Sequence, residues 1–282
     1  MRVLSWNVAH NDDMWKKLDE LRAQEHFDIA LLQEAKPPSD VSDDRTIVPD
    51  PANHELWKTV LPGLPREWRT AIASWKPLQI TPIEAAPLHL VSEEDADRLP
   101  ESYPGAFTAV RVAGTALVSV YGAWEHLPGS HGSYSIAAVH RTISDLTRLW
   151  YGEKQPRVVI AGDWNIWHKY GDRTPAAKQV RQWSTRHNSV FSRLDAEGLR
   201  VAGPYGSGPL ERCPCGTEAE CRHVQTYWHN YKDGATPYQT DFVMATPGIR
   251  ISEPAVVTHL KGESVWAGGI SDHAPVIFDI SQ

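Results

Sequence analysis

Residues 157–167 read RVVIAGDWNIW, an apolar run that ends in the polar side chains of Asp163 and Asn165. The β-branched residues of this run predict a strand over 157–164. A buried strand that ends in a carboxylate loses the hydration of that charge unless something nearby compensates for it. A Gly-Asp pair at a strand end is most often a turn or a cap, so this stretch by itself leaves the function open.

Four further stretches place a polar side chain at or beside the end of an apolar strand. They are LSWNVAH with Asn7, LLQEAK with Glu34, TDFVMAT with Asp241, and GISDHAPV with Asp272 and His273. Each could be a simple turn, but five such motifs in this order rarely arise by accident. A bound divalent cation would compensate for the charges. Oxygen ligands from Asn, Glu and Asp suit Mg2+ or Mn2+ better than tetrahedral zinc.

Short runs rich in β-branched or aromatic residues predict the strands of the fold. They cover 2–8, 28–34, 69–75, 106–112, 115–121, 157–164, 224–230, 239–246 and 274–280. Apolar residues at helical spacing predict helices over 12–25, 134–150 and 175–197. The Pro-, Gly- and Asp-rich connections are expected to be loops: 36–55, 91–105, 122–133, 165–175 and 203–223. We expect one α+β domain over 1–282, with two sheets packed face to face and helices outside.

Taken in order, the motifs WNV (6–8), LQE (32–34), GDWN (162–165) and SDH (271–273) resemble the endonuclease/exonuclease/phosphatase superfamily. Its members include abasic-site endonucleases, pancreatic-type deoxyribonucleases, inositol polyphosphate 5-phosphatases, neutral sphingomyelinases and mRNA deadenylases. The resemblance covers nearly the whole chain. It implies a four-layer α/β/β/α sandwich of two packed mixed sheets with outer helices. It also implies a metal-dependent phosphoric ester hydrolase.

By this resemblance, Asn7 and Glu34 hold the catalytic Mg2+ (or Mn2+), and Asp272 lies near or at the metal. Asp163 positions or deprotonates the attacking water, and Asn165 orients that water and the phosphate. Phosphodiester cleavage needs an activated water in line with the leaving oxygen, and positive charge on the non-bridging oxygens. A metal, an imidazole and a carboxylate together meet these needs.

The same resemblance places His273 against the scissile phosphate and gives Asp241 the task of holding the His273 ring in one tautomer. Tyr121, at the end of LVSVY, matches a tyrosine that nuclease members place near the phosphate. Lys36, which follows LQEA, is a candidate substrate contact. Tyr121 and Lys36 both favour the exonuclease III-like abasic-site nucleases within the superfamily.

Other positions depart from that group. Ala9 and His10 stand where an acidic or amide residue and Gly-x-Arg usually follow WNV. Gln239 and Phe242 replace the arginine and tyrosine of its R-x-D-Y motif. The expected activity is therefore that of a nuclease-like phosphodiesterase, with no abasic-site specificity assigned.

The net charge of −7 is unlike that of a generic nucleic-acid coat protein. Residues 168–200 nevertheless carry seven Lys/Arg against three Asp/Glu, whereas 28–55 carry two against seven. The first segment could form a basic wall that tracks a nucleic-acid backbone and stacks bases. Its candidate contacts are Lys169, Arg173, Lys178, Arg181, Arg186 and the rings of Trp164, Trp167 and Tyr170. The alternative is a basic solvated helix with ordinary core tryptophans.

Three classes of function stay open. The first is a nuclease that cleaves DNA or RNA. The second is a phosphatase or phosphodiesterase acting on a small-molecule or lipid head-group phosphate, which would suit the acidic balance and use the same catalytic residues. The third is a non-enzymatic binding protein, which is disfavoured because every expected catalytic position is filled.

The composition also indicates a cellular setting. No run of about 18 apolar residues occurs, so no membrane span is expected. MRVLSWNVAH lacks the basic and apolar segments of a signal peptide. The odd count of three cysteines argues against a disulfide framework and fits a reducing, cytoplasmic setting. Nucleic acid is the expected partner, and a monomer is favoured.

All three cysteines lie in CPCGTEAECRH, residues 213–223. The spacing C-x-C-x5-C-x-H predicts a Zn2+ site. The ligands would be Cys213, Cys215, Cys221 and His223. Such soft ligands do not suit Mg2+, and four of them would close the site, making it a structural centre that holds the loop 203–223. The alternative is three reduced, unligated cysteines in a polar loop.

Overall fold

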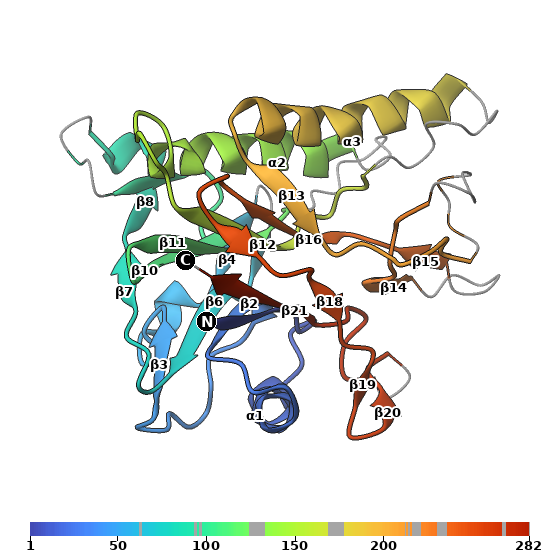
Figure 1. Ribbon diagram of the computed structural model, residues 1–282. Helices are drawn as coiled ribbons and strands as arrows, with labels where there is room; N and C mark the ends of the chain where they lie inside the picture. Colours follow the sequence, from blue (N-terminus) through green and yellow to red (C-terminus); the bar gives the residue numbers. More distant parts are fainter. Residues whose placement is uncertain are drawn as a thin grey trace.

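The structure is a computed structural model. It describes residues 1–61, 64–92, 95, 98–123, 133–168, 178–211, 213, 215, 221–229, 236–266 and 269–281. Figure 1 shows two central sheets between helices. Helix α1 (Met14–Glu25) covers the outer face of one sheet, and α2 (Ser133–Leu146) and α3 (Lys178–Ala196) cover the outer face of the other. The predicted four-layer α/β/β/α sandwich is therefore confirmed.

The first sheet has seven strands in the order β17-β21-β1-β2-β6-β3, with β18 also pairing with β21. In chain order the strands are β1 (Arg2–Asn7), β2 (Ile29–Ala35), β3 (Arg45–Val48), β6 (Arg69–Trp75), β17 (Arg250–Ile251), β18 (Ala255–Val256) and β21 (Val276–Ser281). β1 runs parallel to β2 and antiparallel to β21. Strands from the two ends of the chain thus lie side by side.

The second sheet has six strands in the order β13-β16-β12-β11-β10-β7. In chain order they are β7 (Thr81–Ile83), β10 (Phe107–Val112), β11 (Thr115–Tyr121), β12 (Val158–Asp163), β13 (Arg200–Gly203) and β16 (Asp241–Ala245). β11 and β12 are parallel, and β12 and β16 are antiparallel. Both sheets are therefore mixed, as the resemblance implied.

Four two-stranded sheets complete the described strands. They are β4 (Thr59–Leu61) with β5 (Leu64–Arg66), β8 (Ala85–Pro87) with β9 (Leu99–Glu101), β14 (Tyr227–His229) with β15 (Thr236–Tyr238), and β19 (His259–Leu260) with β20 (Glu263–Ser264). None of the helices in the described part of the chain combines the length and apolar character needed to cross a membrane.

Alternation along the central strands builds the layers. On β2, Leu31 packs between the sheets, whereas Ala30 and Leu32 pack toward α1. The α1 stripe of Met14, Leu18 and Leu21 is buried against that outer face, as its spacing predicted. A second core lies between α2, α3 and the other sheet. Because successive strand residues face opposite sides, one strand contributes to two cores.

Hydrogen bonds between buried polar groups also connect the two sheets. Gln33 Nε2 donates to Ser119 Oγ at 3.0 Å, and Ser119 Oγ donates to the Leu32 carbonyl at 2.7 Å. All three residues are buried, so these bonds replace the water that the polar groups lose on folding. They tie β2 of one sheet to β11 of the other, next to Glu34.

Some predicted boundaries were wrong. The expected loop 36–55 contains the edge strand β3, and the expected loop 91–105 contains β9. The strand expected over 224–230 starts only at Tyr227. These short elements at edges bury few apolar side chains, and their periodicity is correspondingly weak.

Candidate active site

The predicted catalytic residues meet at one edge of the two sheets. Asn7 ends β1 and pairs in register with Gln33, next to Glu34. Tyr121 ends β11 and lies opposite Asp163 at the end of β12. Parallel strands place their carboxyl ends at the same edge, which brings these polar side chains together although they are far apart in sequence.

The glycine of GDWN has a structural role of its own. Gly162 has φ of 157°, and a Cβ there would lie 2.0 Å from the carbonyl oxygen of Val120. The backbone of β11 therefore approaches too closely for any side chain at this position. Gly162 thus allows β12 to stay paired with β11 up to Asp163.

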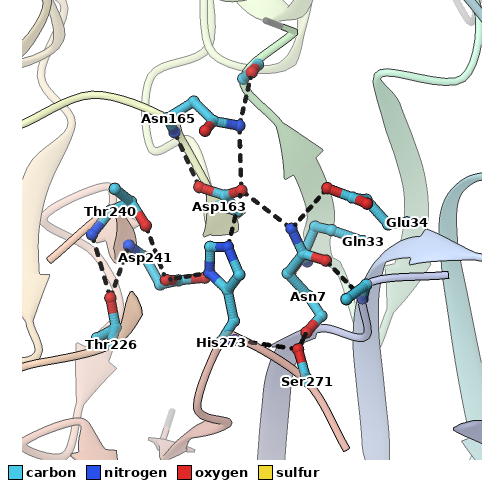
Figure 2. A network of polar contacts seen from close by, with 12 residues as sticks. Asn7, Gln33, Glu34, Asp163, Asn165, Thr226, Thr240, Asp241, Ser271 and His273 are labelled. Atoms are coloured by element: carbon cyan, nitrogen blue, oxygen red, sulfur yellow. Dashed lines mark hydrogen bonds and ion pairs between the residues drawn. The ribbon is translucent and has the colours of Figure 1, made fainter. Parts of the chain in front are cut away.

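His273 lies between two buried carboxylates. His273 Nδ1 donates to Asp241 Oδ2 at 2.9 Å, and His273 Nε2 lies 3.7 Å from Asp163 Oδ2 (Figure 2). The two aspartates are directly opposite each other in the β12–β16 pairing. The Asp241 contact fixes the tautomer, so Nε2 is the nitrogen that faces Asp163 and the reacting side.

These charges set the protonation of the centre. Burial alone would lower the pKa of His273, but the negative charges of Asp241 and Asp163 raise the pKa to about 10. Burial raises the pKa of Asp163 to about 7, against the opposing charge of His273. At neutral pH the imidazole is a cation, and Asp163 titrates near the operating pH, as suits a general base.

Two amides hold the Asp163 carboxylate in place. Asn165 donates from its backbone N–H to Asp163 Oδ1 at 2.9 Å and from Nδ2 to Asp163 Oδ2 at 3.0 Å. Asn7 Nδ2 donates to Asp163 Oδ2 at 3.0 Å and to Glu34 Oε1 at 3.1 Å (Figure 2). Asn7 therefore links the predicted metal ligand Glu34 to the predicted general base. Its own Oδ1 accepts the Ala9 N–H at 2.9 Å.

Several residues around the site adopt left-handed backbone conformations. Ala9, His10, Glu34 and Asn165 have φ of 48°, 46°, 52° and 50°. Such values are uncommon outside glycine and cost free energy, of order 1–3 kcal/mol each where they are strained. Their concentration around Asn7 and Asp163 is typical of a site in which side-chain placement has taken precedence over backbone preference.

His10 is a site residue that the sequence did not point to. Its Nδ1 donates to Glu34 Oε2 at 3.1 Å, and this contact raises the pKa of His10 against the lowering effect of burial. Asp272 is exposed, and its charge also acts on His10. Glu34 and Asp272 thus both lie near His10 on this side of the site, and carboxylate oxygens are ligands that suit a hard divalent cation.

Hydroxyl groups behind the catalytic residues were also missed. Thr226 Oγ1 accepts the backbone N–H groups of Thr240 (3.1 Å) and Asp241 (3.2 Å). Ser271 Oγ donates to the Asn7 carbonyl at 2.7 Å and accepts the His273 N–H at 3.0 Å (Figure 2). The serine of SDH therefore joins the end of β1 to the segment that leads into β21. For Ser271 the SDH motif was the sequence signal. Thr226 lies in no motif, so no sequence signal pointed to it.

Tyr121 is buried beside Asn165, with its ring edge-on to Trp68 at 5.0 Å. Burial, together with the charges of Glu34 and Asp163, raises the pKa of the hydroxyl well above its ordinary range. The hydroxyl therefore stays protonated and can act as a hydrogen-bond donor. The structure brings Tyr121 into the site that its sequence motif predicted.

The residues predicted to contact the substrate lie in different surroundings. Lys36 forms an ion pair with Asp12 near His10. Trp167 stacks on His187 at 5.0 Å and on Tyr238 at 5.2 Å, a packing arrangement. Trp164 is fully buried, which excludes it as a base-stacking face and supports the alternative of a core tryptophan.

Of the basic segment, the prediction for Lys169 and Arg173 lies outside the described residues, as does the ring of Tyr170. The side chains of Lys178 and Arg181 also lie outside them, whereas Arg186 is exposed on α3. The four predicted zinc ligands, Cys213, Cys215, Cys221 and His223, are brought together in a cluster separate from the catalytic residues.

The sequence of residues 4–273 matches the Endonuclease/Exonuclease/phosphatase family. No curated protein matches the chain. Among solved structures, the chain resembles an AP endonuclease from Leishmania major, with a TM-score of 0.62 and 17% identity over 98% of this chain and 86% of that one. It also resembles the 3' phosphatase NExo from Neisseria bound to a product DNA hairpin (TM-score 0.60, 17% identity, 100% of both chains). A mannosyl-6-phosphatase from Bacteroides thetaiotaomicron is similar as well (TM-score 0.54, 11% identity, 100% of both chains).

Proposed function

The chain belongs to the endonuclease/exonuclease/phosphatase family, whose members hydrolyse phosphoric esters, and we propose that it is a Mg2+-dependent nuclease. In this proposal it cleaves a DNA or RNA phosphodiester by attack of water on the scissile phosphate. The observation that carries the proposal is the buried Asp163–His273–Asp241 arrangement, with His273 Nε2 facing Asp163 and Nδ1 bonded to Asp241.

The proposed reaction divides the work between two buried groups. Asp163 accepts a proton from the attacking water, and its pKa of about 7 keeps a large fraction ionised at neutral pH. His273, held as a cation, stabilises the negative charge that develops on the phosphate oxygens. Asp241 is a positioning residue that fixes the His273 ring, and Asn165 holds the Asp163 carboxylate.

Family enzymes depend on divalent metal ions, and the donor chemistry of this site fits one. Glu34 and Asp272, with Asn7 beside them, are the residues that would hold the ion. When bound, it supplies positive charge that polarises the phosphate and lowers the pKa of bound water. Asn7 keeps Glu34 and Asp163 at a fixed separation through its two hydrogen bonds.

A nucleic-acid substrate is supported by an aromatic surface beside the catalytic edge. Trp228 is 39% exposed and stacks on Trp266 with ring centroids 5.9 Å apart. Its backbone N–H donates to the Asp272 carbonyl at 2.7 Å, which places the exposed ring next to the SDH motif. Exposed aromatic faces beside a phosphate site suit the stacking of bases. One similar structure holds a product DNA hairpin.

A second candidate is a phosphatase or phosphodiesterase of a small-molecule or lipid head-group phosphate. The net charge of −7 favours it, since an acidic protein repels a polyanion at long range. The fold is also similar to that of a mannosyl-6-phosphatase.

A substrate panel separates the two candidates. The purified chain is incubated with Mg2+ and end-labelled single-stranded DNA, duplex DNA, abasic duplex DNA and RNA. Parallel reactions contain sugar phosphates, inositol phosphates and sphingomyelin. Internal or terminal cleavage of an oligonucleotide, with analysis of the product ends, is the expected result. Hydrolysis of a small phosphate with every nucleic acid left intact would replace the nuclease proposal with the second candidate.

A further inference from the structure

The three cysteines and His223 form a compact cluster of metal-ligating atoms. Their side-chain donor atoms all lie within 4.8 Å of one another. His223 Nδ1 is 3.3 Å from Cys213 Sγ and 3.5 Å from Cys221 Sγ. Around one tetrahedral Zn2+ with ordinary bond lengths, a nitrogen and a sulfur ligand lie about 3.6 Å apart. The observed separations match this spacing.

The cluster is also shielded from solvent. Cys215 is 1% exposed, Cys221 3% and His223 9%. None of the three cysteines forms a disulfide, and the sequence has no further cysteine. A thiol is only a weak hydrogen-bond donor and acceptor, so contacts among the thiols compensate poorly for burying polar groups in a loop. A bound cation would coordinate the three sulfurs and the imidazole nitrogen at once.

The second nitrogen of the His223 ring gives independent support. His223 Nε2 contacts the backbone carbonyl oxygen of His168. A carbonyl oxygen only accepts, so Nε2 carries the proton and the lone pair of Nδ1 faces the cysteine sulfurs. A metal-ligating histidine is held in this way, with its other ring N–H bonded to a carbonyl or carboxylate. The ring is thus already in the tautomer and orientation that metal binding requires.

We propose that Cys213, Cys215, Cys221 and His223 bind one Zn2+ as a closed structural site, which fixes the following segment, residues 223–228, against Asp241 and His273. Three sulfurs and one imidazole nitrogen favour zinc over the hard Mg2+ of the catalytic edge. Four protein ligands leave no coordination position for a substrate or an attacking water.

The segment 223–228 connects the cluster to Asp241. Three residues after His223, Thr226 Oγ1 accepts the backbone N–H groups of Thr240 and Asp241. The Thr226 carbonyl accepts the Ala274 N–H at 2.7 Å. Thr226 is fully buried, so its position is set by these bonds and by the chain that enters from His223. Fixing His223 therefore restrains the backbone that supports Asp241 and the residue next to His273.

The next two residues contact the SDH motif directly. Tyr227 forms an isolated β-bridge with His273 and stacks on its ring with centroids 4.6 Å apart. The Trp228 N–H donates to the Asp272 carbonyl. In addition, His168, whose carbonyl meets His223, follows Asp163 by only five residues. The cluster thus joins the segment that follows Asp163 to the segment that contacts Asp241 and His273.

The first test is metal analysis of the full chain, purified without chelators and exchanged into Mg2+ buffer. About one zinc ion per chain is expected, as four protein ligands close a single site. Cys221→Ser should lose the zinc. The matched control Arg222→Lys, which changes the exposed residue between two ligands, should keep it. A folded wild-type chain without zinc, or Cys221→Ser with wild-type zinc content, would overturn the proposal.

A second variant and two measurements on the wild type keep the test decisive if Cys221→Ser does not fold. Cys221→His supplies an imidazole that zinc also accepts, so it should fold and retain zinc. In the wild type, exchange of the ion for Co2+ should give the intense visible bands of tetrahedral, thiolate-bound cobalt. All three thiols should resist alkylation until the metal is removed. A weak octahedral cobalt spectrum, or thiols that react equally with and without metal, would contradict a Cys3His site.

The positioning role has its own readout, amide hydrogen exchange. Removal of zinc should accelerate exchange at Trp228 and Ala274, whose N–H groups tie the segment to the SDH region, by about tenfold or more. Exchange at Ile72 in the core of β6 should stay unchanged. Unchanged exchange at Trp228 and Ala274 would refute the positioning role. None of these readouts uses a substrate, so their outcome is separate from that of the nuclease proposal.

Discussion

Asp163 and Asp241 lie directly opposite each other in the antiparallel pairing of β12 with β16, and the His273 ring contacts both carboxylates. The pairing register of the two strands thus sets the distance between the backbones that carry the two aspartates. A slip of β16 by one residue would turn the Asp241 side chain to the other face of the sheet, away from Asp163. The sandwich core therefore determines how Asp163 and Asp241 are placed around His273.

Replacing Asp241 with Asn should separate positioning from chemistry. The ring of His273 would lose its charged partner, so kcat should fall by about 100-fold or more with little change in KM. The pKa of His273, now about 10, should fall because the Asp241 charge, the largest of those that raise it, is gone. His273 would then lose its proton at lower pH, and the alkaline limb of the pH–rate profile should shift to lower pH.

The matched control is Asp279→Asn, which changes an exposed aspartate on β21. It should leave both kcat and the pH–rate profile unchanged. An Asp241→Asn enzyme with the wild-type alkaline limb would show that Asp241 does not set the protonation of His273.

Glu34 should determine the Mg2+ concentration that activity requires. Removal of Mg2+ by dialysis should abolish activity, and added Mg2+ should restore it. Glu34→Gln loses a charged oxygen ligand, so the Mg2+ concentration for half-maximal activity should rise by about 10- to 100-fold. Glu153→Gln, in an exposed turn, is the control and should not change the Mg2+ requirement. Activity that persists after exhaustive dialysis would contradict a metal-dependent site.

Trp228 tests the nature of the substrate. If the exposed ring stacks on a base, Trp228→Ala should weaken binding of a single-stranded oligonucleotide by about 5- to 150-fold. Hydrolysis of a small phosphate ester should be unaffected. Tyr151→Ala removes another exposed aromatic, at 81% exposure, that precedes the opposite end of β12 and serves as control. Equal oligonucleotide affinity for the Trp228→Ala variant and the wild type would remove the main structural support for base contact.

His187 predicts how stability depends on pH. Its Nδ1 accepts the Trp167 N–H at 3.1 Å, and burial lowers its pKa from 6.5 to about 4. Between pH 6.5 and 4 the unfolded chain takes up a proton that the folded chain does not, so the free energy of unfolding falls as the pH falls. The loss should reach at most about 3 kcal/mol near pH 4 and then stop.

Urea unfolding of the wild type and His187→Asn at pH 7 and pH 5 measures this effect. Asparagine keeps an acceptor for the Trp167 N–H but cannot be protonated, so the pH-dependent loss should shrink. His259→Asn, at an exposed position, should behave like the wild type. Identical pH dependence in His187→Asn and the wild type would assign the acid sensitivity to other groups.

The central strands and the site edge could be predicted from sequence because burial dictates them. β6 and β11 match the predicted ranges 69–75 and 115–121 at both ends. Each is a run of side chains that packs in the core, so its limits are set by where burial ends. The motif residues Asn7, Asp163, Asp241 and His273 then meet because the ends of neighbouring strands are fixed by the pairing.

Contacts that depend on loop paths could not be predicted in this way. His10 meets Glu34 only because two successive left-handed residues turn the chain after β1. Trp164 lies next to Asp163 in sequence, yet its ring points into the core and donates to the Phe242 carbonyl. Periodicity reports which face of a strand is buried, but it carries no information on the direction of a side chain beyond the strand end.

The most direct test of the whole account compares wild type with Asp163→Asn under single-turnover conditions, with Mg2+ and the best oligonucleotide from the substrate panel. The amide preserves shape but cannot accept the proton of water. The account predicts oligonucleotide cleavage by the wild type and a loss of at least about 1000-fold in the chemical step of the variant. Cleavage by Asp163→Asn at the wild-type rate would contradict the account.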